Sequence, residues 1–237
     1  MAYYQQEPSA LQKLTGTIEL TAQQAAVIKQ TYILFGVAIF CAIAGGYVGA
    51  TSQTLVHFFS TGMGWIVAMI VLNVVPYVAI SARNNPVLGV TALVADGFIA
   101  GIALSPLLWV ASMVNPSLIL VSLAVAACVF VGVTGYVMMS GRTFSAPRGL
   151  MAGLFLSTTA ILVLNHFMNI GLLGIVVSLG IGALGVCGLV YSTSNVLHSS
   201  ASDSAIPGAL SLFASMFNIF VATLNILLRL LGGGRRS

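Results

Sequence analysis

The residues of this chain that could take part in chemistry are few, and most of them lie near the C-terminus. Ser211, Ser215, Asn218, Asn225 and Arg229 are spaced so that they share one face of an α-helix. The other faces carry Leu, Phe, Met, Ile and Val. Such a polar stripe predicts either hydrogen bonds to neighbouring helices or a hydrated path along the stripe, and the sequence leaves both open.

A second candidate is Asp96, which lies within the apolar segment TALVADGFIAG. An ionisable side chain at membrane depth is costly, so it is treated as a candidate functional residue. We expect Asp96 either to be protonated or to find a cationic partner, for which His166 and Arg229 are candidates. A purely structural role remains open for Asp96. His166 is equally compatible with a satisfied polar residue near the membrane interface.

No catalytic constellation is present in the sequence. It contains no HExxH, GxSxG or P-loop motif and no pair of intramembrane aspartates. Cys41, Cys128 and Cys187 are far apart within apolar runs, which predicts neither a disulfide framework nor a metal site. The sequence therefore predicts a non-enzymatic protein with no cofactor, no metal and no catalytic residues.

The amino-acid composition indicates whether these residues lie in a protein that is surrounded by water or by lipid. Apolar residues make up 59% of the 237 residues and charged residues 5%, and the mean hydropathy is +1.07. Soluble domains carry about 25% charged residues. We therefore expect an integral membrane protein whose partner is the lipid bilayer, and no nucleic-acid partner.

The hydropathy pattern predicts an all-α polytopic bundle of seven transmembrane helices. Each expected span has the roughly 20 apolar residues needed to cross a bilayer. Residues 1–28 are expected to form a polar tail, 29–232 the membrane domain and 233–237 a short basic tail. The expected spans are 30–50, 62–82, 87–110, 117–139, 149–169, 171–193 and 206–230.

The basic residues predict the orientation of the bundle. Five of them flank one set of loops, whereas the alternate loops near 51–61, 110–116 and 169–171 have none. By the positive-inside rule the N-terminus is expected in the cytoplasm. Seven spans would place the C-terminus outside the cytoplasm, but three further arginines near the C-terminus disagree with that under the same rule. The side of the membrane on which the C-terminus lies therefore remains open. The five residues are Lys13, Lys29, Arg83, Arg142 and Arg148, and the three are Arg229, Arg235 and Arg236.

Small residues predict close packing between helices. Gly97 and Gly101 form one GxxxG motif, and Gly149 and Gly153 form another. Such pairs let helix backbones approach each other in a membrane. The motif is common, so it predicts packing and no particular function.

Four segments in matching order resemble the Bax inhibitor (transmembrane Bax inhibitor motif) family, in particular its bacterial YccA-like branch. The resemblance covers roughly residues 30–232 and implies six helices around a central seventh. The segments are GFIAGIALSPLL, SGRTFSAPRGL, LVYSTSNVLH and GALSLFASMFNIFVATLNIL.

The resemblance also implies an acidic pair that shares protons and gates calcium in a pH-dependent leak. At the matching positions this chain has Ser192 and Ser215, and Thr143 replaces an acidic residue of the loop. Calcium prefers carboxylate oxygens, and proton sensing near neutral pH needs a coupled acidic pair. We therefore do not expect calcium binding or an intact leak mechanism.

The resemblance leaves two hypotheses. In the first, the protein modulates or joins a membrane protein assembly, for example a membrane-anchored AAA protease, as YccA-like members do through their cytoplasmic tail. In the second, it forms a weakened pH-sensitive calcium or proton leak lined by the polar residues above. The expected location is a bacterial inner membrane, and a mitochondrial inner membrane remains open.

Overall fold

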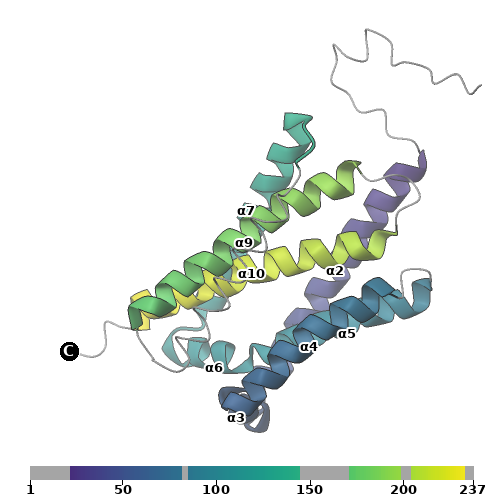
Figure 1. Ribbon diagram of the computed structural model, residues 1–237. Coiled ribbons are helices and arrows are strands. Elements are labelled where there is room, and N and C mark those ends of the chain that lie inside the picture. The colour runs from purple at the N-terminus through teal and green to yellow at the C-terminus, as the bar shows by residue number, and fades with distance from the viewer. Residues whose placement is uncertain (1–21, 82–84, 145–170, 199–203, 233–237) are drawn as a thin grey trace, which may run out of the picture.

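The computed structural model describes residues 22–81, 85–144, 171–198 and 204–232. Within these ranges every regular element is an α-helix, so the predicted all-α class is confirmed. Figure 1 shows the arrangement. The helices are α2 (Ala22–Thr51), α3 (Gln53–Ser60), α4 (Gly62–Ser81), α5 (Pro86–Ala103), α6 (Ser105–Val114), α7 (Ser117–Ser140), α9 (Gly171–His198) and α10 (Ala205–Gly232).

The described helices provide five candidate membrane spans, or six if a bent pair is counted as one. Five helices, α2, α4, α7, α9 and α10, are each long and apolar enough to span a bilayer. The bent pair α5 and α6 forms a sixth span if counted together. The expected span over 149–169, with His166, Gly149 and Gly153, lies outside the described residues.

The third span is broken, which differs from the single helix expected over 87–110. The axes of α5 and α6 meet at 48° around Leu104. The cause is Pro106, which has no N–H to donate to the carbonyl of Ile102 and whose ring crowds that carbonyl. The hydroxyl of Ser105 donates to the same carbonyl at 2.6 Å, so the freed acceptor remains satisfied.

The connector after the first span is also helical. Ser52 caps the start of α3, where its side chain accepts a hydrogen bond from the N–H of Leu55. Thr61 joins α3 to α4, because its hydroxyl donates to the carbonyl of Phe58 and accepts from the N–H of Gly64. Two adjacent caps therefore turn the chain sharply back into the bundle.

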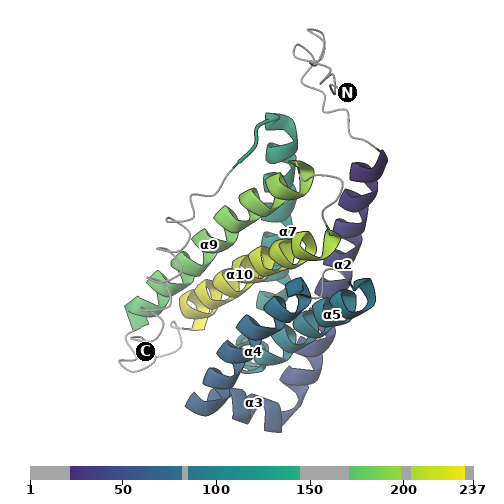
Figure 2. The same ribbon diagram turned by 45° about the vertical axis from the view of Figure 1, so that its right-hand side comes forward.

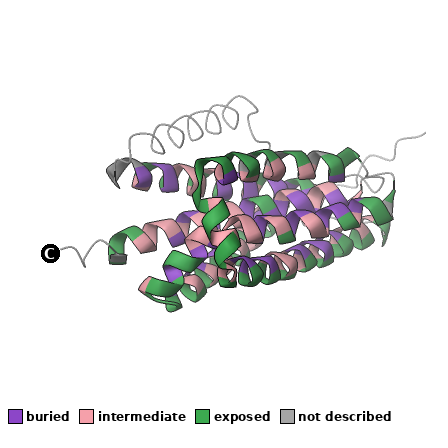
Figure 3. Cartoon of the chain, turned by 90° about the horizontal axis from the view of Figure 1, so that it is seen from below, coloured by how far each residue is buried: buried purple, intermediate pink, exposed green. Residues whose placement is uncertain are grey.

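The last helix lies at the centre of the described bundle. α10 packs against α2, α4, α5, α6, α7 and α9. Figures 1 and 2 show it running side by side with α9, with α7 and α2 beyond the pair. Figure 3 shows the buried residues concentrated on the inner faces of the helices. The main core includes Leu210, Leu212 and Phe213 of α10 together with Leu34, Phe35 and Leu93.

Candidate functional site

The polar stripe of α10 lies against a row of glycines in α9. A methyl group added at Gly188 would be 2.8 Å from the hydroxyl oxygen of Ser215. One added at Gly185 would be 2.9 Å from the backbone oxygen of Ser215, and one at Gly182 would be 3.2 Å from the Cβ of Ala222. We call this contact the α9–α10 seam. It places the stripe inside a tight helix pair.

Three polar side chains of this stripe, those of Ser211, Ser215 and Asn225, bond within their own helix. The hydroxyl of Ser211 donates to the carbonyl of Gly208 at 3.0 Å, and that of Ser215 to the carbonyl of Ser211 at 2.7 Å. The amide of Asn225 donates to the carbonyl of Val221 at 3.1 Å. The hydrogen bonds to neighbouring helices that the stripe suggested are replaced here by bonds to carbonyls three or four residues earlier.

The C-terminal turns of α9 carry three consecutive buried hydroxyl residues, Ser192, Thr193 and Ser194. Ser192 lies one helical turn beyond Gly188, so it shares the seam with Ser215. The hydroxyl of Ser194 accepts a hydrogen bond from the N–H of Phe144 at 2.7 Å. This bond attaches the segment after α7, which includes the exposed Thr143, to the end of α9.

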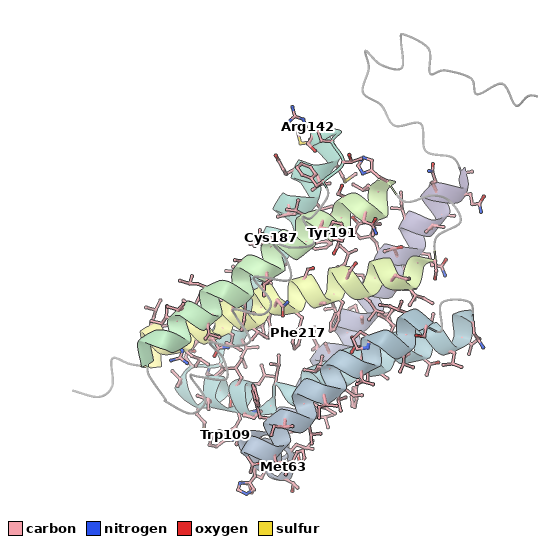
Figure 4. The ribbon with its side chains drawn as sticks, in the orientation of Figure 1. Met63, Trp109, Arg142, Cys187, Tyr191 and Phe217 are labelled. Carbon is pink, nitrogen blue, oxygen red and sulfur yellow. The ribbon has the colours of Figure 1, made fainter. Side chains whose placement is uncertain are left out.

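A left-handed residue makes that attachment possible. Gly141 ends α7 with a φ of 58°, a conformation that glycine adopts without steric cost. The chain then returns toward α9, where the ring of Phe144 lies 5.7 Å from that of Tyr136. Figure 4 shows Arg142 at this end of α7, close to the end of α9.

Asp96 lies in a different part of the bundle. Its side chain is 5% exposed, on the face of α5 that carries the core residues Leu93 and Ala100. The structure does not bring Arg229 to it, because the guanidinium of Arg229 lies against Gly174 near the start of α9. The candidate partner His166 lies outside the described residues.

A second seam joins α5 to α2 next to Asp96. A methyl group added at Gly97 would lie 2.5 Å from the carbonyl oxygen of Ala38, and one at Gly101 would collide with the carbonyl of Ala42. From the other side, a methyl group at Gly45 would collide with the carbonyl of Phe98. We call this contact the α2–α5 seam. On the α2 side GGYVG (45–49) repeats the small-residue spacing, a signal that the two predicted GxxxG motifs do not include.

The chemistry available in the α9–α10 seam is limited. Hydroxyl groups do not ionise near neutral pH, and hard divalent cations prefer several oxygens that include carboxylates. Among the residues that the structure describes, no three His, Cys, Asp or Glu side chains are grouped as metal ligands. The arrangement supports close packing of two helices and offers no group for acid–base chemistry at these two positions.

Comparisons with known proteins place these features in a family. The family model described as "Inhibitor of apoptosis-promoting Bax1" matches residues 24–235. The "Modulator of FtsH protease YccA" of Escherichia coli is 28% identical over 85% of this chain and 89% of its own length. An uncharacterized protein of Campylobacter jejuni is 24% identical over 96% of this chain and 97% of its own length. "Protein lifeguard 4" of mouse is 31% identical over 46% of each chain.

Proposed function

Because this chain belongs to the Bax inhibitor family of membrane proteins, we propose that it acts as a modulator or accessory subunit of a membrane protein assembly. A membrane-anchored AAA protease is the partner class that fits best. The observation that carries this proposal is the Escherichia coli relative named as a modulator of the FtsH protease, which aligns over most of both chains. The names of the family and of this relative describe an inhibitor and a modulator, not enzymes.

The interior of the bundle supports a role through contacts. The two positions where the family resemblance implies an acidic pair carry Ser192 and Ser215, and both are buried in the α9–α10 seam. The Ser215 hydroxyl is already bonded to a carbonyl of its own helix. An uncharged, tightly packed seam suits a rigid scaffold that presents its outer faces and termini to a partner.

The orientation belongs to the same proposal. We place the protein in a bacterial inner membrane with its N-terminus in the cytoplasm, as the distribution of basic residues favours. Lys29 near the start of α2 and Arg142 after the end of α7 would then face the cytoplasm. In this proposal residues 1–28 form the tail that contacts the cytoplasmic part of the protease.

The test is affinity purification of the full-length chain from its native membrane in a mild detergent. We expect a membrane protease at near-stoichiometric yield, and slower degradation of a membrane substrate when the chain is added to the purified protease. A variant that lacks residues 1–21, which precede α2, should retain the membrane fold but lose this inhibition. Recovery of the chain alone, together with unchanged degradation, would refute the proposal.

A second candidate function is a calcium or proton leak, which the buried carboxyl of Asp96 favours. In this alternative the path is lined by Asp96, Ser192, Ser215, Asn218 and Asn225. Flux through proteoliposomes separates the two functions. If the family's acidic pair is what a leak requires, Ser192→Asp combined with Ser215→Asp should create a calcium flux that the parent chain lacks.

Flux through the unmodified chain tests directly whether it forms a leak. A substantial flux that falls in Asp96→Asn would support the leak and count against a purely structural interior. A parent flux that remains the same in Asp96→Asn and in Ser215→Ala would remove these residues from any path.

A further inference from the structure

A lateral groove opens between α2 and α7, away from the α9–α10 seam. It has a volume of about 460 Å³ and is lined from α2, α5, α6, α7 and α10. Its floor is the central helix, through Phe213, Met216, Phe217 and Phe220. Figure 4 shows Phe217 on the side of α10 that faces away from α9. The groove thus lets the surroundings of the bundle reach its central helix.

Both ends of the groove are closed by protein. Toward the start of α2, the rings of Phe35 and Phe130 stack with centroids 4.8 Å apart and join α2 to α7. At the other end α6 packs against both α2 and α7. The rims remain open, because Ile43 of α2 is 50% exposed and Leu120 of α7 is 68% exposed. The groove therefore opens sideways, toward the hydrocarbon of the bilayer.

The volume and the shape of the groove limit the possible occupants. An α-helix with its side chains is about 10 Å across, so a docked helix would leave most of its width outside a groove of this volume. A cavity of about 150 Å³ is enough to bind one benzene ring, so a groove of about 460 Å³ has room for roughly eighteen carbon atoms. That is the length of one lipid acyl chain. Water is a poor occupant, because the lining is almost entirely apolar and offers it few hydrogen-bond partners.

The distribution of polar side chains along the groove indicates which way a bound acyl chain would lie. α2 and α10 start close together, where the Thr31 hydroxyl donates to the carbonyl of Ala205 at 3.5 Å. The two helices therefore run in the same sense, and the groove extends from Ile39 and Phe213 toward Thr51 at the end of α2. Polar side chains line only this last part.

Those polar side chains are Tyr47, Thr51 and Ser112, and the exposed Trp109 lies on the adjacent turn of α6. Figure 4 shows Trp109 at this end of the molecule. Aromatic side chains with a polar group are enriched where the hydrocarbon meets the headgroups. The deep end of the groove, at Phe213, is apolar.

We propose that this groove binds one acyl chain of a bilayer phospholipid. The headgroup lies beside Thr51 and Ser112, in the leaflet opposite the start of α2, and the chain end lies against Phe213 on the central helix. This site goes beyond the proposed function, since it requires neither a protease nor an ion.

The test is photolabelling of the full-length chain in vesicles of phosphatidylethanolamine and phosphatidylglycerol. The phospholipid probe carries a diazirine either near the carboxyl end or at the tip of one acyl chain, and labelled residues are mapped by mass spectrometry. We expect the first probe to label α10 near Phe220 and the second to label it near Phe213. The reverse order would place the headgroup at the other end and overturn the assignment.

A matched pair of variants tests whether the lipid probe reaches α10 through the groove. Ile43→Trp fills the rim and should lower labelling of α10 several-fold. Ile33→Trp is the control, because Ile33 lies on the same helix, is 55% exposed and does not line the groove. It should leave labelling unchanged.

Two results would overturn the proposal. The first is an absence of label on α10 in the unmodified chain, which would mean that another part of the chain, a second copy or a protein partner covers the groove. The second is equal labelling of α10 in Ile43→Trp and Ile33→Trp when both variants elute as the parent does in size-exclusion chromatography. If Ile43→Trp fails to fold, the labelling order in the parent still decides.

Discussion

Both seams of this bundle bring two helices into close contact, but they do so with different residues. In the α2–α5 seam glycines lie on both helices, and each backbone touches the backbone of the other helix at Gly45, Gly97 and Gly101. In the α9–α10 seam the glycine row lies on α9, and Ser215, Ile219 and Ala222 of α10 fill the space above Gly182, Gly185 and Gly188; Gly208 of α10 in turn lies against Val196 of α9.

The difference shows where the structure tolerates change. A backbone carbonyl cannot move aside without distorting its helix, whereas a side chain can change its rotamer or be shortened by substitution. The α2–α5 seam is therefore fixed at the level of the backbone. The α9–α10 seam involves backbone atoms at Gly185, but at Gly188 and Gly182 it depends on side chains, so the chemistry of the residues at these two contacts can vary while the helix pair is kept. The positions of the family's acidic pair lie in this second seam.

The largest effect is expected at the α2–α5 seam. In Gly101→Ala the new methyl group collides with the carbonyl of Ala42 and crowds the backbone nitrogen of Gly46 at 2.6 Å. We expect the free energy of unfolding to fall by about 3 kcal/mol or more, measured by thermal unfolding in detergent.

The matched control is Gly132→Ala in α7, where a methyl group would meet nothing within 4 Å. Alanine is the better helix former by about 0.5–1 kcal/mol, so this variant should be as stable as the parent or slightly more so. Equal stability of the two variants would contradict the description of the α2–α5 seam as a backbone contact.

An intermediate and reversible effect is expected at the α9–α10 seam. In Gly188→Ala the new methyl group lies 2.8 Å from the Ser215 hydroxyl oxygen but 3.7 Å from its Cβ. We expect a loss of about 1–3 kcal/mol, most of which Ser215→Ala should restore in the double variant. Ser215→Ala alone should cost less than about 1 kcal/mol, because its hydroxyl bonds only within its own helix.

A double-mutant cycle measured by the same unfolding experiment separates these contributions. If the losses in the free energy of unfolding of the two single variants simply add, the two positions do not touch. The α9–α10 seam would then not be a side-chain contact at Gly188.

The smallest effect is expected at Gly182, further along the same seam. A methyl group there would meet the Cβ of Ala222 at 3.2 Å, a contact that a small shift relieves. The gain in helix propensity offsets part of that cost, so Gly182→Ala should change the free energy of unfolding by less than about 1 kcal/mol. A loss as large as that of Gly101→Ala would erase the distinction between the two seams.

The sequence was sufficient for the helical class, the membrane environment and the family. A long run of apolar residues is almost sufficient to predict a membrane helix, because the segment must cross the hydrocarbon core and satisfy its backbone hydrogen bonds internally. The sequence also indicated that α10 has one polar face, since helical spacing is a local property. What that face contacts is not local: its partner is a glycine row more than 25 residues earlier in the chain.

Other features depend on detail that hydropathy does not contain. Pro106 was visible in the sequence, but the break at Leu104 required weighing one missing hydrogen bond against a long apolar run. The groove arises where α2 and α7 diverge, which no single helix encodes. The separation of Asp96 from Arg229 likewise follows from how the helices assemble and not from the residues themselves.

The break between α5 and α6 also affects how the chain fits the thickness of the bilayer. A straight helix over 86–114 would be about 43 Å long, well beyond a hydrocarbon core of about 30 Å. With a bend of 48° the ten residues of α6 advance roughly 10 Å along the α5 axis instead of about 15 Å. The bend thus shortens this span by about one helical turn, and the buried Ser105 hydroxyl keeps the carbonyl of Ile102, which lies against Gly49 of α2, paired. At about 38 Å the bent span is still longer than the hydrocarbon core, so the bend relieves part of the hydrophobic mismatch and tilt must accommodate the rest.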